Sequence, residues 1–148
     1  MKKYLKWIIV LAWLIIIFSF SSQPAVISDG NSKYVIKIFD LLGLNLNSMW
    51  GDLANFIVRK IAHFLEYLIL YILLFNAVYD KLNFKKAIVI SLLGVFLYAC
   101  SDEIHQLFVP GRASRLRDVI IDTSGGALGA LIEYIVSFQK NFALQIKS

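Results

Sequence analysis

The stretch that decides the fold is Ser101–Asp122, SDEIHQLFVPGRASRLRDVIID, in which nine charged, histidine or amide side chains fall within 22 residues. The chain around it is strongly apolar: 59% of its 148 residues are hydrophobic and only 17% are charged. Soluble domains carry about 25% charged residues. A polar cluster among apolar segments needs a partner or a function. The nine side chains are Asp102, Glu103, His105, Gln106, Arg112, Arg115, Arg117, Asp118 and Asp122.

Charge and cysteine content exclude several classes of protein. The formal net charge is +5, but the lysines lie beside hydrophobic runs, so the basic excess indicates membrane topology and anionic lipid, not nucleic acid. Cys100 is the single cysteine, which excludes an internal disulfide and a thiolate metal cluster. The sequence contains no zinc-finger spacing, P-loop, GxGxxG or GxSxG motif.

Four long apolar runs predict an all-α polytopic membrane protein, a single domain over residues 1–148. The expected transmembrane helices cover residues 4–21, 58–79, 86–107 and 116–138, the second of them continuing a helix capped by Asn47 or Ser48. The first run has a basic start and the length of a span, although a cleaved signal peptide, with Ser19 or Ser21 near the cleavage site, is the alternative.

The segment between the first two spans has two interpretations. Lys33 and Lys37 fall on one face of a helix, with Tyr34 and Ile38 on the other, and Gly43 follows. This spacing predicts a short amphipathic helix on the membrane surface. A plain loop is the close second interpretation.

The uncharged runs in the last three spans are too short to cross a bilayer. They contain 13, 15 and 10 residues, whereas a spanning helix needs about 20. Each span must therefore take ionisable residues into the depth of the membrane. The second span takes His63 and Glu66, the third takes Asp102 and His105, and the fourth takes Asp118 and Asp122.

The orientation of the spans predicts that these groups meet at the outer face. The basic N-terminus places both termini in the cytoplasm of a cell-membrane protein, so all four arginines fall outside. Helical spacing adds that Asp102, His105 and Gln106 share a face, with Glu103 turned about 100° away. A GxxxG pattern, Gly125 and Gly129, lies on the acidic face of the last span and allows close helix approach. One stripe of the helix that continues into the second span holds Asp52, Asn55, Arg59, His63 and Glu66.

Three motifs resemble the VanZ-like family of small bacterial membrane proteins. They are RKIAHFLEY (residues 59–67), SDEIHQLFVPGR (101–112) and DVIIDTSG (118–125), and FSSQ at 20–23 also fits, with Phe20 in its first position. The resemblance spans nearly the whole chain. It implies a cell-envelope context, because the namesake is linked to resistance to teicoplanin, a glycopeptide acting on the outer face of the membrane. It implies no catalytic roles.

Three functions remain open. An outward pocket could bind an anionic lipid, a cell-wall precursor or a glycopeptide through Arg59, Glu103, Gln106, Arg112, Arg115 and Arg117, since arginine pairs bidentately with phosphate and carboxylate. A membrane hydrolase or transferase acting on a lipid-linked phosphate could use His63, Glu66, Asp102, His105, Asp118 and Asp122 as acids, bases or ligands of a divalent metal. The third function is a structural network of paired charges. The sequence does not indicate an oligomeric state.

Overall fold

A computed structural model describes residues 3–147, except the side chains of residues 3, 52, 140, 141 and 143–147. The described chain is helical and contains no strand. Four helices are long and apolar enough to cross a membrane, over Tyr4–Ser21, Ala54–Val78, Phe84–Gln106 and Leu116–Gln139. The all-α fold with four membrane spans predicted from the sequence is therefore confirmed.

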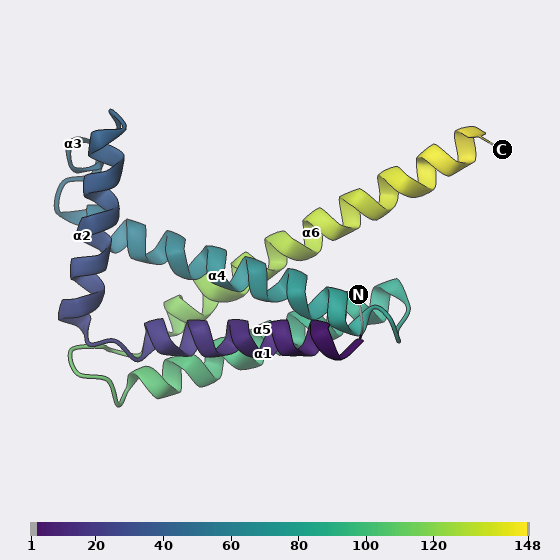
Figure 1. The fold of residues 1–148 in the computed structure, drawn as a ribbon, viewed down its shortest axis with the longest axis horizontal. Helices are drawn as coiled ribbons and strands as arrows, with labels where there is room; N and C mark the ends of the chain where they lie inside the picture. Colours follow the sequence, from purple (N-terminus) through teal and green to yellow (C-terminus); the bar gives the residue numbers. More distant parts are fainter. Residues whose placement is uncertain (1–2, 148) are drawn as a thin grey trace.

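The long helices are α1 (Lys3–Ser21), α4 (Ala54–Val78), α5 (Phe84–Gln106) and α6 (Leu116–Lys147). In Figure 1, α1, α4 and α5 run side by side, while α6 crosses them obliquely and its C-terminal part projects beyond the bundle. Helix α4 lies at the centre of the bundle, because it contacts α1, α2, α5 and α6. Its buried face carries Tyr67, Leu70 and Tyr71, each 0% exposed.

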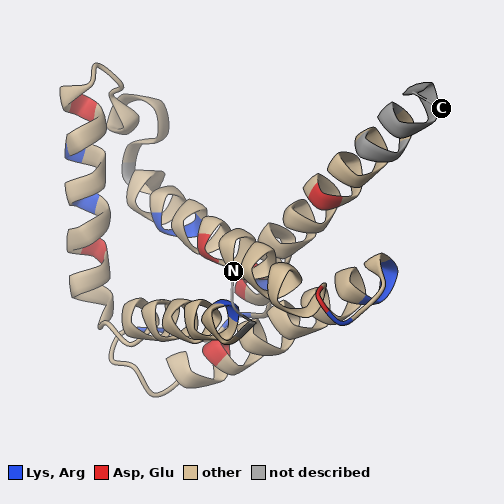
Figure 2. Ribbon diagram, turned by 45° about the vertical axis from the view of Figure 1, so that its right-hand side comes forward, with Lys and Arg blue, Asp and Glu red and all other residues tan. Residues whose placement is uncertain are grey.

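The outer surfaces of the long helices are apolar. Ile8 is 60% exposed, Leu97 58% and Phe138 63%. Such surfaces would be unfavourable in water but match the hydrocarbon of a bilayer. In Figure 2 the charged positions are few on the long helices, whereas α2 (Ala25–Leu41) carries both signs along its length.

Helix α2 lies across one end of the bundle in Figure 1, as expected for a helix on a membrane surface. A helix between the first two spans was predicted and is confirmed, although it is longer than the amphipathic pattern suggested. Its protein-facing side carries Ser32 and Ile36, while Tyr34 is 67% exposed. Gly43 follows with φ +86°, a left-handed conformation that glycine adopts without strain.

The expected continuous helix from Asn47 or Ser48 is wrong. Asn45 is the cap, its Oδ1 accepting from the Ser48 amide at 2.9 Å, and it starts a one-turn helix, α3 (Leu46–Trp50). Gly51 then adopts φ +54° and a single 3-10 turn, η1 (Gly51–Leu53), leads into α4. The spanning helix thus starts at Ala54. The side chain of Asp52, the first member of the expected stripe, lies outside the described residues.

Candidate functional site

His63, Asp102 and Asp122 meet in the bundle at the end covered by α2. One ligand atom from each lies within 4.8 Å of the others, and the three residues come from α4, α5 and α6. They are 8%, 3% and 2% exposed. We call these three residues the buried triad. All three residues are among those that the sequence suggested as acids, bases or metal ligands, and the fold brings them together.

A glycine contact explains why α6 reaches the triad. A Cβ added to Gly125 would lie 2.2 Å from the backbone oxygen of Phe64, so only glycine permits this approach of α6 to α4. Phe64 directly follows His63, and Gly125 lies one turn after Asp122. The close approach therefore places the Asp122 carboxylate beside the His63 imidazole.

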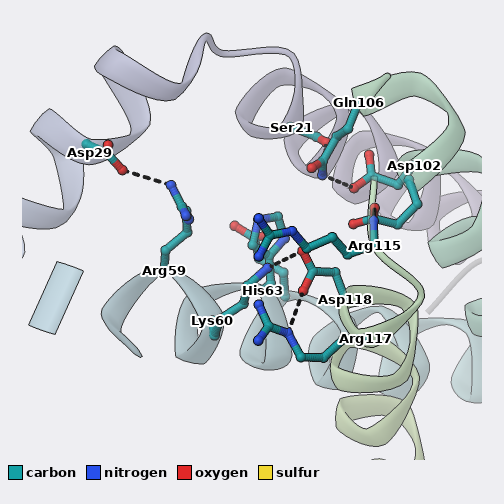
Figure 3. Close-up of polar contacts among 12 residues, drawn as sticks. Ser21, Asp29, Arg59, Lys60, His63, Asp102, Gln106, Arg115, Arg117 and Asp118 are labelled. Carbon is teal, nitrogen blue, oxygen red and sulfur yellow. Dashed lines mark hydrogen bonds and ion pairs between the residues drawn. The ribbon is translucent and has the colours of Figure 1, made fainter. Parts of the chain in front are cut away.

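The end of α1 orients one carboxylate of the triad. Gln106 Nε2 donates to Ser21 Oγ at 2.8 Å and to Asp102 Oδ2 at 3.1 Å (Figure 3). Ser21 is 0% exposed, so this network is closed to solvent. The other carboxylate oxygen, Asp102 Oδ1, is buried without a hydrogen-bond partner among the described residues.

His63 faces a second carboxylate on its own helix. Its Nδ1 lies 3.5 Å from Glu66 Oε2, one turn further along α4. This distance is too long for a good hydrogen bond. Both atoms are buried without a hydrogen-bond partner in the described part of the chain. Buried polar atoms are rarely left unpaired, so this region has unused capacity for a ligand.

The ion pairs differ from the expected matching of arginines with buried acids. Lys60 Nζ lies 2.6 Å from Asp118 Oδ2, and Arg59 pairs with Asp29 of α2 at 2.8 Å (Figure 3). Arg117 approaches Asp118 only to 3.7 Å and its side chain is 53% exposed. The acids expected to pair with arginine were Glu66, Asp102, Glu103, Asp118 and Asp122. Among the described residues, the Arg117–Asp118 contact is the single ion pair between an arginine and one of these acids.

Arg112 is held by neutral acceptors. Its Nε donates to the backbone oxygen of Gln23 at 3.1 Å, at the junction of α1 and α2. The loop that carries it also contacts this junction, since the Ala25 amide donates to the Pro110 oxygen at 3.2 Å. Burial, and then the nearby Arg59 guanidinium, lower the pKa of Arg112 from its ordinary value. An arginine stays protonated in proteins, and among the described residues Arg112 forms no close ion pair, although Asp102, Asp29 and Glu103 act on it from farther away.

Two adjoining cavities share Arg59 and Arg112 in their walls. The first, of about 210 Å³, lies between α1, α2 and α4 and includes His63 and Glu66. The second, of about 130 Å³, is lined by Lys60, Gln106, Gly111, Ala113, Asp118, Phe56, Arg115 and Arg117 in addition to the shared pair. We call the second one the cationic pocket.

Two predicted site residues lie apart from the triad. His105 Nε2 is 3.0 Å from Ser22 Oγ and its ring packs on Phe18 at 4.5 Å, so it faces α1. Glu103 is buried, and its Oε2 accepts from the Arg115 amide at 2.8 Å, just before α6 begins. A carboxylate there stabilises the unpaired amides and dipole of the helix N-terminus. Glu103 thus has a structural contact that sequence reasoning did not anticipate.

Sequence reasoning also missed two site residues. Lys60, the partner of Asp118, stands three residues before His63 and so shares its helical face, a signal that could have been used. Asp29, the partner of Arg59, offers no such signal, because the pair exists only through the packing of α2 across the bundle.

Comparison with known proteins identifies the family. No curated protein and no solved structure matched the chain. The model of the VanZ/LLP1 family matches residues 6–137, a range that contains all but the outermost two residues of the first and last candidate spans, the two middle spans, and every residue of the two cavities. The chain therefore belongs to the VanZ-like family of membrane proteins.

Proposed function

We propose that this protein binds the phosphate-bearing headgroup of an anionic envelope lipid in the cationic pocket, at the extracytoplasmic face of a cell membrane. The observation that carries the proposal is the excess of positive charge. Five cationic side chains line the pocket: Arg59, Lys60, Arg112, Arg115 and Arg117. Asp118 and Asp29 neutralise two of them, so five minus two leaves three positive charges.

Arginine geometry favours a phosphate ligand. The planar guanidinium donates two parallel hydrogen bonds to phosphate or carboxylate oxygens, and such charge-assisted bonds are about twice as strong as neutral ones. Arg117 is oriented by stacking on Phe56, with its guanidinium carbon 5.0 Å from the ring centroid. A preoriented guanidinium loses less conformational entropy on binding.

The neighbouring cavity suits the rest of a lipid. Its wall includes the apolar side chains of Phe20, Val35 and Val58 beside its polar groups. A headgroup in the cationic pocket would therefore have apolar surface within reach for the first carbons of the acyl chains. Cell-wall precursors joined to lipid through phosphate have the same chemistry. Binding of either ligand would give the protein a role in envelope homeostasis or in susceptibility to teicoplanin.

The experiment measures binding of short-chain dihexanoyl phosphatidic acid to the purified full chain in detergent by calorimetry. Arg115→Gln with Arg117→Gln should weaken binding about 30-fold, at roughly 1 kcal/mol for each of the two lost cations. The matched control is Lys85→Gln with Lys86→Gln, which removes two exposed cations at the other end of the bundle and should leave affinity unchanged.

Two further ligands distinguish the source of the anion. Dihexanoyl phosphatidylcholine should bind more weakly than phosphatidic acid, because its headgroup has no net charge. Inorganic phosphate competing as well as the lipid would identify a free-phosphate site. Equal binding of phosphatidic acid by the wild type and the double arginine variant would refute the proposal. Teicoplanin susceptibility of cells expressing the two chains is the corresponding cellular measurement.

A second candidate is a hydrolase or transferase acting on a lipid-linked phosphate. The observation that favours it is the buried triad, whose imidazole and carboxylates can move protons in the transition state. Release of inorganic phosphate from a lipid-linked diphosphate by the wild type, abolished by His63→Ala, would support this candidate. A chain that binds the lipid without releasing phosphate fits binding alone.

A further inference from the structure

We propose that His63, Asp102 and Asp122 form a binding site for one divalent transition-metal cation, Zn²⁺ or Mn²⁺. The three donor atoms lie within 4.8 Å of one another and come from three different helices. One imidazole and two carboxylates are a ligand set that both cations accept. Three protein ligands with an open position are the arrangement of a catalytic zinc site.

The donor spacing allows binding after a small adjustment. Ligands at 2.0–2.2 Å from a metal are roughly 3.0–3.5 Å from one another. Donor atoms as far as 4.8 Å apart therefore have to move about 1–2 Å closer to one another. Side-chain rotation can supply a movement of this size. The backbone positions need not change, because Gly125 already holds α6 against α4.

Unpaired buried atoms are the second observation that points to a ligand. Asp102 is 3% exposed, and its Oδ1 is buried without a hydrogen-bond partner among the described residues. His63 is 8% exposed, and its unpaired Nδ1 is the ring nitrogen that faces Glu66. Gln106 holds the other Asp102 oxygen and leaves Oδ1 available. Outer-shell hydrogen bonds of this kind orient metal ligands. Glu66, 3.5 Å from the imidazole, is placed to act as another outer-shell partner.

Charge balance favours a cation at this position. Isolated carboxylates within a membrane-spanning bundle are costly unless they are paired. In the described part of the chain no lysine or arginine forms an ion pair with Asp102 or Asp122. Arg112 acts on Asp102 and Lys60 acts on Asp122 from farther away, but the close contacts of these two cations are with the Gln23 backbone oxygen and with Asp118. One divalent cation neutralises two carboxylates.

The test is metal binding by the purified full chain. Protein prepared without chelator is analysed by inductively coupled plasma mass spectrometry, then stripped with EDTA and titrated with Zn²⁺ and Mn²⁺ separately by calorimetry. We expect one ion per chain. Asp102→Asn and Asp122→Asn should each weaken affinity about 100-fold or more, since even outer-shell changes cost about 10–100-fold.

Matched variants separate loss of a ligand from loss of the fold. His105→Ala removes the other histidine and Glu133→Gln removes another α6 acid, and both should bind metal like the wild type. Gln106→Leu should weaken binding about 10–100-fold but retain one ion per chain. Size-exclusion profile and circular dichroism report folding of every variant. The proposal is overturned if the wild type shows no saturable binding of either ion, or if Asp102→Asn and Asp122→Asn bind as tightly as the wild type. Neither result depends on whether the cationic pocket binds phosphatidic acid.

Discussion

Replacement of Gly125 by alanine tests how the helices are packed around the site. The added Cβ would lie 2.2 Å from the Phe64 backbone oxygen, 3.1 Å from its carbonyl carbon and 3.2 Å from the Leu68 amide nitrogen. Ordinary contacts are about 3.5 Å, so the α4 and α6 backbones must separate by about 1 Å. Overpacking of this kind lowers the free energy of unfolding by about 1–3 kcal/mol. We expect the upper end of this range, because the α4 backbone atoms cannot rotate out of the way as a side chain can.

Neighbouring glycines provide a graded comparison. A Cβ at Gly126 would lie 2.8 Å from Val95 Cγ1, and a Cβ at Gly129 would lie 2.6 Å from Tyr71 Cδ1. Alanine at either position therefore meets a side chain, which can move, whereas alanine at Gly125 meets backbone atoms. A Cβ at Gly30 meets nothing within 4 Å. Gly30→Ala lies in α2 and should stabilise by about 0.5–1 kcal/mol, because alanine loses less backbone entropy in a helix.

The assay is reversible denaturation by SDS from mixed micelles, followed by circular dichroism. The free energy of unfolding should fall most for Gly125→Ala, less for Gly126→Ala and Gly129→Ala, and should not fall for Gly30→Ala. The interpretation is refuted if Gly125→Ala unfolds like the wild type, or if it is less destabilising than Gly126→Ala.

Three further predictions concern individual contacts. Lys60→Met should destabilise the fold by about 3 kcal/mol, the lower end for a broken buried pair, because the exposed Arg117 at 3.7 Å remains as a partner of Asp118. Adding Asp118→Asn should recover much of that loss in a double-mutant cycle measured by the same SDS titration. Asn83→Ala removes the side chain that caps α5 by accepting from the Lys86 amide at 2.9 Å, and should cost about 1 kcal/mol, read as a lower thermal midpoint. Gly111→Ala forces a left-handed φ of +74° on a residue with a Cβ and should cost about 1 kcal/mol or more; an unchanged thermal midpoint would show that the loop can adopt another conformation.

The helices and the convergence of polar groups could be predicted because both follow from local rules. Span length and hydropathy locate four helices, and alternation of direction places Ser21, His63, Asp102 and Asp122 at one end. The GxxxG pattern correctly predicted that another helix approaches the last span closely, since Gly125 contacts the α4 backbone.

Pairings between elements could not be predicted in the same way. Arg59 pairs with Asp29 because α2 lies across the bundle end, and no sequence pattern specifies that position. Glu103 contacts the Arg115 amide because of the path of the loop before α6. Composition suggested that the arginines pair with the acids of the spans, but Asp118 pairs with Lys60, and Arg112 donates to the backbone oxygen of Gln23. The break at Gly51 was missed because a glycine in an otherwise helical pattern does not specify its φ.

The account depends on the cationic pocket and the triad lying at the outer face of the membrane, and cysteine accessibility tests this most directly. Cys100 is first replaced by alanine, and single cysteines are introduced at Ala113, which lines the cationic pocket, and at Lys81, in the exposed turn between α4 and α5. In intact cells a membrane-impermeant maleimide should label Ala113→Cys, and it should label Lys81→Cys only after permeabilisation. Labelling of Lys81→Cys but not of Ala113→Cys in intact cells would contradict the account.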